Sequence, residues 1–598
     1  MDDMSLDLAS LRQAYANGVS PEDVVRLVYQ RIRLANDPGI FISLLDEDAA
    51  IARARALGPY DATKPLWGAP FAIKDNIDFA ALPTTAACPD FAYQPVEDAF
   101  CVARLIAAGA VPIGKTNLDQ FATGLVGVRS PYPVPVNACD PALVPGGSSS
   151  GSAVAVSRGL VAFALGTDTA GSGRVPAGLN NIVGLKPTLG AVSTRGVVPA
   201  CRTLDCVSVF ALTVNDAYAV FSEMAAYDAK EGLSREMRVV PLGPAQPKLR
   251  LAVPDASSLK LGGDEQSRTA FEAAKQSALA SGASVVEIDM TPFYEVARLL
   301  YEGPWVAERY QAVRTFIEST PDSFHPVTRG IIEGATRFSA ADTFGALYKL
   351  ADLRRAASAV WKDVDALMTP TYPRPRTLAD LAADPIGPNS ELGTYTNFVN
   401  LMDLCALAIP TRFRDDGFPS GVTFIAPKGR DAQIAAFGAA MHARANVPLG
   451  ATGRRAPLTP TLDSRAGAGE IEIAVVGAHL SGMALNTELT NRGGRFLRAC
   501  DTRAEYKLYA LPGGPPRRPG LLRVASGGGA IATEVWALPE VTFGSFVAGV
   551  PAPLGIGTTL LADGTQPKGF IVESIATIGA EDITMWGGWR AYCAGVAA

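Results

Sequence analysis

Two segments in which serines are flanked by glycines constrain the fold of this chain more than any other feature of its sequence. The first reads Gly-Gly-Ser-Ser-Ser-Gly-Ser at 146–152, and the second reads Gly-Thr-Asp-Thr-Ala-Gly-Ser-Gly-Arg at 166–174. Glycines beside a serine let other backbone approach its hydroxyl, and the turn at 169–172 can aim several N–H groups at one point. The apolar run at 153–165 predicts a buried element, not a flexible linker. The pattern indicates a serine nucleophile suited to acyl transfer from an amide or ester.

The base that would activate such a serine is not an obvious histidine, because the chain has only His325, His442 and His479. Lys74 follows a short apolar strand expected at 71–73. Burial among apolar neighbours lowers the pKa of a lysine from about 10.4 and can make it a proton acceptor. Taken alone, this lysine also fits a solvated or ion-paired residue. The serine segments downstream favour its role as the base.

Residues 109–116 match the nucleotide-binding pattern of a glycine, four residues and Gly-Lys-Thr. A phosphate-binding loop follows a strand and begins a helix, whereas residues 98–108 have helical periodicity and residues 111–113 are strand-like. Pro112 also lacks an N–H group for phosphate. We therefore expect no ATP site here.

The composition is typical of a globular enzyme. The 598 residues are 48% hydrophobic and 19% charged, with a formal net charge of −6. The mild acidity argues against nucleic acid as a partner, and the apolar run at 153–165 is too short to span a membrane. The acidic start, residues 1–8, does not resemble a signal peptide. We expect a soluble, cytoplasmic protein.

The eight cysteines lie at 88, 101, 139, 201, 206, 405, 500 and 593, with no Cys-x-x-Cys spacing. Such scattered cysteines are typical of reduced, packed thiols. We therefore expect no metal site and no cofactor.

The order of expected elements predicts an α/β fold, with a mixed β-sheet core covered by helices. Ser20-Pro-Glu-Asp reads as the capped start of a helix over 24–34. Farther along, a strand-like segment at 249–253 precedes a helical one at 264–281. Strands and helices thus alternate along the first part of the chain.

Residues 451–470 break this alternation, since they are rich in Thr, Pro, Arg, Gly and Ala. They predict a linker between a first domain over 1–450 and a smaller, β-rich domain over 471–598. The second domain begins with a strand and a glycine-punctuated turn that carries His479 and Asn486. A lone histidine is usually structural, but a strand-end loop with His, Ser and Asn also fits a polar site.

In this order, the motifs resemble the amidase signature family over most of residues 1–450. The resemblance rests on Lys74, on the two serine segments and on Gly-Leu-Lys-Pro-Thr at 184–188. It implies a Ser-cisSer-Lys relay. In that relay Ser172 is the nucleophile, Ser148 follows a cis peptide and bridges, and Lys74 is the base.

The same resemblance assigns roles around the nucleophile. Asp168 and Arg174 flank the turn, and we expect them to fix its shape and not to react. The oxyanion would be held by the backbone amides of Thr169, Ala170, Gly171 and Ser172.

An amidase part followed by His-Leu-Ser-Gly-Met-Ala-Leu-Asn at 479–486 resembles the allophanate hydrolase family across nearly the whole chain. The resemblance implies a γ-glutamylcyclotransferase-like C-terminal domain. It implies hydrolysis of allophanate (urea-1-carboxylate) to ammonia and N-carboxycarbamate, which the second domain decarboxylates, in urea or s-triazine (cyanuric acid) catabolism. It further implies a homodimer and a separate biotin-dependent urea carboxylase as a possible partner.

The resemblance to the allophanate hydrolase family also implies which residues bind the substrate. Tyr301 and Arg309, eight positions apart on an expected helix, would bind the substrate carboxylate, and Gly124 would line the pocket. A bidentate guanidinium suits a small carboxylate that has almost no apolar surface. Alternatively, the pair shares one core-facing stripe or surface face. In the second domain, His479 is the expected proton carrier, with Asn486 and Glu534 as weaker candidates.

Two other readings stay open. A different amidase, or the glutaminase subunit of a tRNA-dependent amidotransferase, would keep Lys74, Ser148 and Ser172 without needing the second domain. An inactive amidase scaffold with a binding role is the non-enzymatic alternative.

Overall fold

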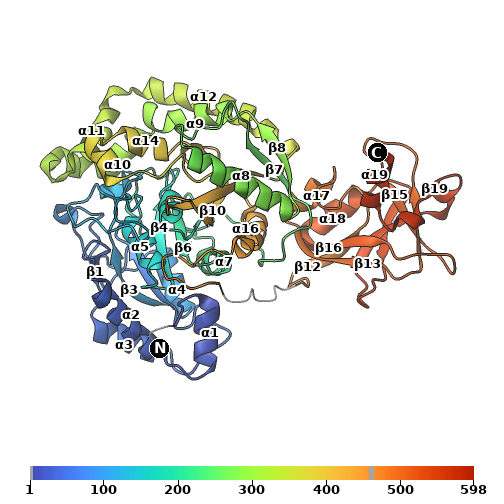
Figure 1. Ribbon diagram of the computed structural model, residues 1–598, viewed down its shortest axis with the longest axis horizontal. Coiled ribbons are helices and arrows are strands. Elements are labelled where there is room, and N and C mark those ends of the chain that lie inside the picture. Colours follow the sequence, from blue (N-terminus) through green and yellow to red (C-terminus); the bar gives the residue numbers. More distant parts are fainter. Residues whose placement is uncertain (1–3, 457–463, 598) are drawn as a thin grey trace. The chain divides into compact units, whose positions relative to one another are not determined.

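The computed structural model describes residues 4–456 and 464–597 and separates into two compact units (Figure 1). Unit 1 holds most of the chain before residue 457. Unit 2 holds the described residues from 464 onward together with two short earlier segments, Val240–Leu251 and Gly282–Ser284. The expected linker lies partly outside the described residues, at 457–463, as do residues 1–3 of the acidic start. The expected domain limits therefore stay predictions.

Unit 1 is built on a mixed sheet with the strand order β1-β3-β2-β4-β6-β5-β10-β11-β9-β7-β8. Its strands are β1 (Phe41–Leu44), β2 (Pro70–Lys74), β3 (Val111–Thr116), β4 (Phe163–Asp168), β5 (Val183–Lys186), β6 (Cys206–Ala211), β7 (Arg250–Pro254), β8 (Ser284–Ile288), β9 (Ala366–Pro370), β10 (Leu404–Phe413) and β11 (Pro419–Pro427).

Helices surround this sheet, as the alternating sequence pattern predicts. They are α1 (Leu8–Ala16), α2 (Pro21–Ala35), α3 (Glu47–Arg55), α4 (Phe100–Ala107), α5 (Ser150–Ser157), α6 (Val175–Leu179), α7 (Val214–Met224), α8 (Glu265–Ala280), α9 (Thr291–Glu302), α10 (Val306–Ser319), α11 (Pro326–Glu333), α12 (Ala340–Ala357), α13 (Leu378–Ala383), α14 (Gly387–Leu392), α15 (Asn397–Leu401) and α16 (Asp431–Ala445). The cap expected at Ser20 is present, because its side chain accepts a hydrogen bond from Asp23 N.

The centre of the sheet brings the two serine segments to one edge. Strand β2 pairs in parallel with β4, with Ile73 opposite Leu165, so their carboxyl ends point the same way. The first serine segment leads into α5, whose residues are all buried, and the second joins β4 to α6. The residues predicted to react therefore lie where a strand ends or a helix begins.

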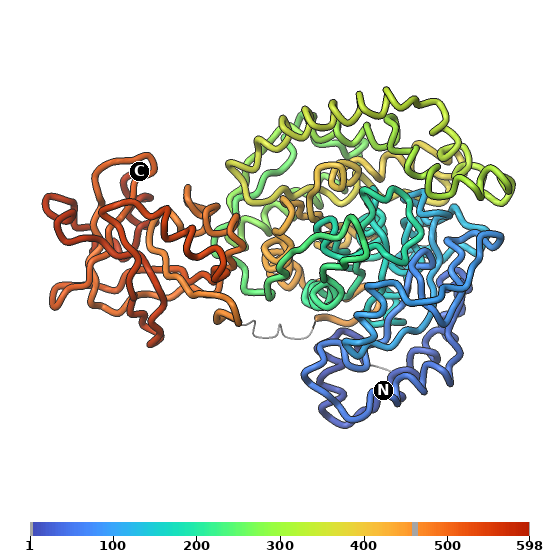
Figure 2. The backbone as a smooth tube through the Cα atoms, turned by 180° about the vertical axis from the view of Figure 1, so that it is seen from behind, coloured from blue at the N-terminus to red at the C-terminus, as the bar shows by residue number. Residues whose placement is uncertain are grey.

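A layer of helices covers one side of unit 1. Helices α9, α10, α11 and α12, green to yellow in colour, lie together there in both opposite views (Figures 1 and 2). Helix α9 packs against α15 and α12, and Phe293 and Leu300 of α9 are buried in the same apolar cluster as Phe398 of α15. This layer carries Tyr301 and Arg309 to the site.

The nucleotide-binding pattern at 109–116 falls on a strand. Helix α4 precedes it, and Gly114, Lys115 and Thr116 belong to β3. Lys115 is buried, and its Nζ lies 3.2 Å from Asp75 Oδ1 and 2.9 Å from Thr84 Oγ1. Its charge is thus neutralised within the protein, and this segment has no phosphate-binding loop, as predicted.

Unit 2 is rich in β-structure, as expected. One sheet has the order β13-β16-β12-β18-β17 and a second has the order β15-β14-β19. The strands are β12 (Glu470–Val475), β13 (Arg495–Asp501), β14 (Tyr506–Ala510), β15 (Pro519–Arg523), β16 (Ala532–Pro539), β17 (Leu554–Thr558), β18 (Lys568–Val572) and β19 (Glu581–Asp582), and the helices are α17 (Asn486–Thr490), α18 (Glu540–Ala548) and α19 (Trp589–Ala597). Its apolar core includes Trp536, Trp589 and Phe570.

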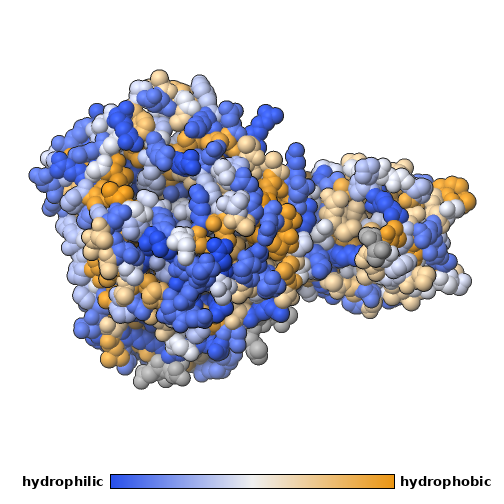
Figure 3. Space-filling view, turned by 45° about the horizontal axis from the view of Figure 1, so that its top comes forward, coloured by the Kyte–Doolittle hydropathy of each residue, from blue (hydrophilic) through white to orange (hydrophobic). Residues whose placement is uncertain are grey.

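Hydrophilic side chains cover much of the face of unit 1 drawn in Figure 3, with hydrophobic ones scattered among them. Among the helices of the described residues, none is long and apolar enough to cross a membrane. Within the same residues, no cluster of His, Cys, Asp and Glu has the arrangement of a metal site.

Candidate active site

Lys74 and Ser148 meet at the buried carboxyl end of β2. Lys74 Nζ lies 2.8 Å from Ser148 Oγ and 2.7 Å from Thr167 Oγ1. The peptide between Gly147 and Ser148 is cis, as the resemblance implies. Thr167, in β4, belongs to this contact although no sequence signal pointed to it.

The surroundings of Lys74 change its acidity in the direction that a base needs. Removal from water lowers the pKa of this fully buried lysine to about 7, opposed by the nearby carboxylates of Asp119, Asp205 and Asp168. Near neutral pH a large fraction of Lys74 is therefore the free amine. A free amine 2.8 Å from a serine hydroxyl can accept a proton through that serine.

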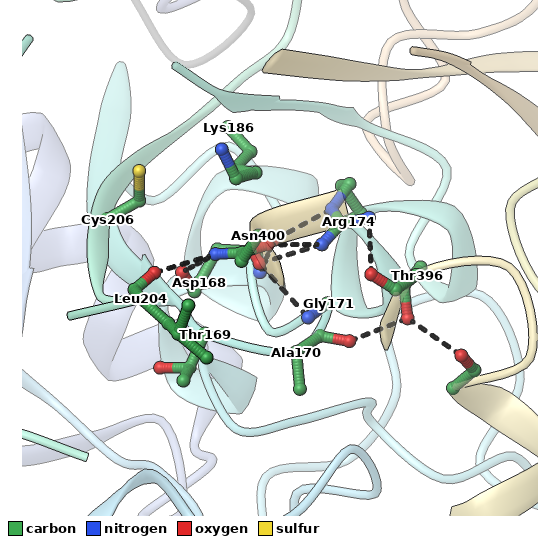
Figure 4. Close-up of polar contacts among 12 residues, drawn as sticks. Asp168, Thr169, Ala170, Gly171, Arg174, Lys186, Leu204, Cys206, Thr396 and Asn400 are labelled. Atoms are coloured by element: carbon green, nitrogen blue, oxygen red, sulfur yellow. Dashed lines mark hydrogen bonds and ion pairs between the residues drawn. The ribbon is translucent and has the colours of Figure 1, made fainter. Parts of the chain in front are cut away.

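Asp168 holds the turn that carries Ser172. Its carboxylate accepts hydrogen bonds from Gly171 N and Gly173 N and a bidentate pair from the Arg174 guanidinium, at 2.8 and 2.9 Å (Figure 4). Both Asp168 and Arg174 are fully buried. As expected, these two residues fix the shape of the turn.

This arrangement narrows the set of oxyanion donors. The N–H of Gly171 donates to Asp168 Oδ1 at 3.0 Å, so it is not available to an oxyanion. Among the described residues, the N–H groups of Thr169, Ala170 and Ser172 form no hydrogen bond with a protein acceptor. Three of the four amides named from the sequence therefore remain as donors, because the carboxylate that shapes the turn occupies the other.

Helix α15 and the residue before it hold the turn from a distant part of the chain. Thr396 Oγ1 donates to Ala170 O at 2.7 Å, and Asn400 Nδ2 donates to the carbonyls of Asp168 and Leu204 (Figure 4). A Cβ at Gly171, where φ is +131°, would lie 2.3 Å from Thr396 Oγ1. Sequence reasoning missed Thr396 and Asn400, since single polar residues far along the chain carry no motif.

The three predicted substrate-binding residues lie together. Arg309 is buried, and its Nη1 donates to Ala122 O and Thr123 Oγ1 at 3.3 and 3.1 Å, beside Gly124. Its guanidinium carbon lies 5.6 Å from the centre of the Tyr301 ring. The prediction that one helix carries both Tyr301 and Arg309 is wrong, because Gly303 and Pro304 separate α9 from α10. This break turns the two side chains toward each other.

Asp119 is a further residue that the sequence did not indicate. It is fully buried, and its carboxylate accepts hydrogen bonds from Gly127 N and Arg129 N, each at 2.9 Å. A Cβ at Gly124 would lie 2.4 Å from Asp119 Oδ2. Gly124 is therefore needed for the close approach of this carboxylate, which also opposes the drop in the pKa of Lys74.

In unit 2, His479 lines a small cavity. Its Nε2 lies 3.1 Å from Glu488 Oε2, and its ring stacks on Phe570 with 5.0 Å between ring centres. Glu488 and Arg518 line the same cavity of about 60 Å³. Burial lowers the pKa of His479, although Glu488 opposes the shift, so the neutral imidazole is favoured at neutral pH.

The other two candidates of unit 2 have structural partners. Asn486 Nδ2 donates to His479 O at 2.9 Å and so holds the loop of that histidine. Glu534 is buried and accepts hydrogen bonds from Ser481, Trp536 and Arg590. These contacts make Asn486 a positioning residue and Glu534 the centre of a separate buried network.

The fold and the site together define an amidase. Residues 23–435 match the Amidase family, and residues 471–594 match the Allophanate hydrolase C-terminal domain. The chain belongs to the amidase family, and its second domain identifies the branch that carries an allophanate hydrolase C-terminal domain.

Solved structures and sequence relatives both agree with this family assignment. The Kluyveromyces lactis allophanate hydrolase structure is 41% identical, with a TM-score of 0.78 and 99% of each chain covered. The Saccharomyces cerevisiae urea amidolyase is 44% identical over 92% of this chain, which spans only 31% of that relative's length. One subunit of the Streptococcus thermophilus glutamyl-tRNA(Gln) amidotransferase is 34% identical over 66% of this chain and 87% of its own. The chain is thus an amidase-signature hydrolase.

Proposed function

We propose that this enzyme hydrolyses allophanate to ammonia and N-carboxycarbamate. The observation that carries the proposal is the buried Lys74–Ser148 contact of 2.8 Å, in the same unit as the Arg309 guanidinium and the Tyr301 ring. The first pair supplies an acid–base relay and the second a carboxylate-binding site. The allophanate hydrolase relative, which matches over both domains, supports this substrate.

In the first half of the reaction, the Ser172 hydroxyl gives its proton to Ser148 Oγ, whose own proton passes to the free amine of Lys74. Ser172 Oγ forms a bond to the terminal amide carbon, and the carbonyl oxygen becomes an oxyanion held by the N–H groups of Thr169, Ala170 and Ser172. The tetrahedral intermediate then expels its amide nitrogen. That nitrogen takes a proton returned through Ser148, leaves as ammonia, and an acyl-enzyme remains.

In the second half, water attacks the acyl carbon and gives its proton through Ser148 to Lys74. The bond to Ser172 Oγ breaks, and the proton returns to this oxygen. N-carboxycarbamate leaves and the enzyme is restored. Arg309 and Tyr301 hold the substrate carboxylate throughout, which orients the terminal amide toward Ser172.

The second domain acts on this intermediate. We assign its decarboxylation to unit 2, with His479 as the proton carrier and Asn486 as the residue that positions its loop. Glu534 has a supporting structural role. The enzyme works in the cytoplasm as a homodimer without a cofactor, in urea or s-triazine nitrogen catabolism. A separate biotin-dependent urea carboxylase would supply its substrate in the urea route, in keeping with the greater length of the urea amidolyase relatives.

The test is ammonia release from allophanate, malonamate, biuret and glutamine by the wild type and by Ser172→Ala. We expect allophanate to be the preferred substrate and the variant to be inactive with a wild-type fold. Preference for glutamine would instead favour an amidotransferase glutaminase. Turnover of none of the four, with no covalent labelling of Ser172 by an acylating probe, would favour the inactive scaffold.

A further inference from the structure

A cleft of about 530 Å³ in unit 1 adjoins the candidate active site. Tyr301 lines this cleft, and its ring lies beside the Arg309 guanidinium. Asn397 also lines it, directly after Thr396, whose hydroxyl donates to Ala170 O in the turn of the nucleophile. The cleft therefore contacts Tyr301 of the carboxylate-binding pair, and one of its lining residues is the chain neighbour of Thr396, which holds the nucleophile turn.

The charged side chains of this cleft are mostly of one sign. Four cations line it, and Glu302 is the acidic residue among the lining residues; the cations are Arg129, Lys260, Arg298 and Arg337. Within the part of the chain that the structure describes, none of the four forms an ion pair with a carboxylate of the protein. A concave surface with excess charge of one sign and low-dielectric walls concentrates ligands of the opposite charge.

Arg129 marks the inner end of the cleft. Its side chain is buried, and its Nη1 and Nη2 donate to the carbonyls of Thr123 and Pro385, both at 3.1 Å. Thr123 also accepts a bond from Arg309 through its hydroxyl, so the two guanidinium groups hold one residue from two sides. Burial and then the charge of Arg309 lower the pKa of Arg129, with Asp119 opposing the shift. Two buried cations are thus held close together at Thr123, beside Gly124.

A second pair of cations, Lys260 and Arg298, lies in the cleft with exposed side chains. Lys260 Nζ lies 3.9 Å from the centre of the Tyr294 ring. Its pKa is lowered by burial and by the charge of Arg298, which places these two cations within electrostatic reach of each other. Like charges gathered in one cleft repel each other unless an anion joins them. Within the described residues, Lys260 and Arg337 make cation–π contacts with Tyr294 and Phe338, but no carboxylate of the protein forms an ion pair with the outer cations.

We propose that this cleft is a cationic vestibule, in which Lys260, Arg298 and Arg337 attract the anionic substrate and Arg129 directs it toward Arg309. The inference rests on the proposed function, because it requires a small anionic substrate. Allophanate offers little apolar surface, so charge is its main source of binding free energy. The vestibule raises the local concentration of the anion and lowers KM, and it leaves the relay at Lys74 and Ser148 untouched.

The experiment replaces the three outer cations together, in the variant Lys260→Ala/Arg298→Ala/Arg337→Ala. At low ionic strength we expect KM for allophanate to rise about tenfold, with kcat unchanged. The salt dependence of kcat/KM should also become flatter in this variant, because salt screens the charges that the substitutions remove. Replacing the acidic residue, Glu302→Gln, should act in the opposite direction and lower KM.

The matched control removes the same amount of charge elsewhere, in Arg26→Ala/Arg33→Ala/Arg268→Ala. These three arginines are exposed and do not line the cleft. We expect the control to keep the KM and the salt dependence of the wild type. An equal rise of KM in the control would overturn the vestibule, since net charge alone would then explain the effect.

The outcomes separate this inference from the proposed function. An active triple variant with unchanged KM and unchanged salt dependence would overturn the vestibule alone. A rise of the same size in KM for the neutral analogue biuret would also overturn it, because the cause would then be steric. If the wild type releases no ammonia from allophanate, the proposed function fails. Calorimetric titration of malonamate into the wild type and the triple variant then decides: weaker binding to the variant supports the vestibule, and equal affinities overturn it.

Discussion

The chemistry of this site depends first on one buried lysine. Lys74 ends a strand whose five residues are all buried, and two hydroxyl groups, of Ser148 and Thr167, contact its Nζ. Hydroxyl groups do not replace bulk water as a solvent for an ammonium, so the charged form is disfavoured. The three nearby carboxylates keep the pKa near 7 and prevent a deeper drop. The lysine is thus poised between its two protonation states at neutral pH.

A pH profile tests this assignment. Because the free amine is the reactive form, kcat/KM should rise with pH through about 7 and then level off. Lys74→Ala should lose at least about 10³-fold in kcat, since both halves of the reaction need the relay. The measurement is the initial rate of ammonia release between pH 5.5 and 9, in steps of about half a unit, an interval chosen to bracket the expected midpoint. Lys115→Ala is not a suitable control, because it would leave the buried Asp75 carboxylate without its ion-pair partner. Lys64→Ala, at an exposed position, is the suitable control. A profile flat from pH 5.5 to 9 would contradict the role of Lys74.

A second prediction at the residue scale concerns Gly124. The substitution Gly124→Ala places a Cβ 2.4 Å from Asp119 Oδ2, so the carboxylate or the loop must move. We expect kcat/KM for allophanate to fall by about 10²-fold, because small displacements at a positioned site are costly. Steady-state kinetics and the circular dichroism spectrum together test this. Gly18→Ala is a poor match because φ is positive there, whereas Gly345→Ala has open space around its Cβ, does not line the cleft and serves as the control. Wild-type kinetics in Gly124→Ala would show that the loop yields freely.

At the scale of elements, the turn between β4 and α6 is held from three sides. Asp168 binds two of its N–H groups and the Arg174 guanidinium, and Thr396 and Asn400 bind its carbonyls from α15 and the residue before it. Such a turn cannot relax toward other conformations without leaving buried polar groups unpaired. Its rigidity keeps the three N–H groups that form no hydrogen bond within the described residues in a fixed arrangement, as an oxyanion site requires.

The element-scale prediction is that Asp168→Asn weakens both the fold and the reaction. The substitution leaves the buried Arg174 charge unpaired, which costs about 3–5 kcal/mol of stability. It also loosens the turn, so kcat should fall by about 10²-fold or more. Denaturant unfolding and initial-rate kinetics measure the two effects. Asp322→Asn, which removes an exposed ion pair with Arg329, is the matched control and should change stability by less than about 1 kcal/mol. If the Asp168→Asn variant is destabilised but keeps the kcat of the wild type, Asp168 contributes to stability and not to the reaction.

On the scale of the whole molecule, each of the two units has its own apolar core and its own cavity with ionisable side chains in its lining. The proposed reaction divides in the same way, because amide hydrolysis needs a relay and an oxyanion site, whereas decarboxylation needs mainly a proton carrier. The amidotransferase relative matches only the amidase part, at 66% of this chain. The match to the Amidase family ends at residue 435, so the second step of the proposed reaction is assigned to a part of the chain outside that match.

The whole-molecule prediction uses His479→Ala. Ammonia from the first step should appear at the wild-type rate, because the relay of unit 1 is intact. Carbon dioxide from the intermediate should then lag behind ammonia, whereas in the wild type the two should appear together. Coupled assays of both products measure the lag. His442→Ala is a matched histidine substitution in unit 1 and should show no lag. Simultaneous release of both products in His479→Ala would remove this residue from the second step.

Local sequence patterns were sufficient to predict the parts of the site whose residues are neighbours along the chain. The glycine-rich segments predicted the serine turns, the inverted order of helix and strand excluded a phosphate loop, and the apolar strand before Lys74 predicted its burial. Each of these depends on local geometry, which a few neighbouring residues determine. The resemblance then supplied roles for Tyr301 and Arg309 that no periodicity contained.

Contacts between distant segments were decided only by the tertiary structure. Thr396 and Asn400 hold the turn of the nucleophile, whereas Asp119 holds the segment of Gly127 and Arg129. Arg129 and Arg309 both contact Thr123. Each of these side chains is a single polar residue without a motif. The Gly171 amide is withdrawn from the oxyanion donors by a local contact, with Asp168 three residues earlier, which the sequence motif did not predict. A sequence specifies which groups can donate, accept or ionise, but the pKa of Lys74 and the partners of each N–H group depend on burial and distance, which arise only when remote strands and helices pack together.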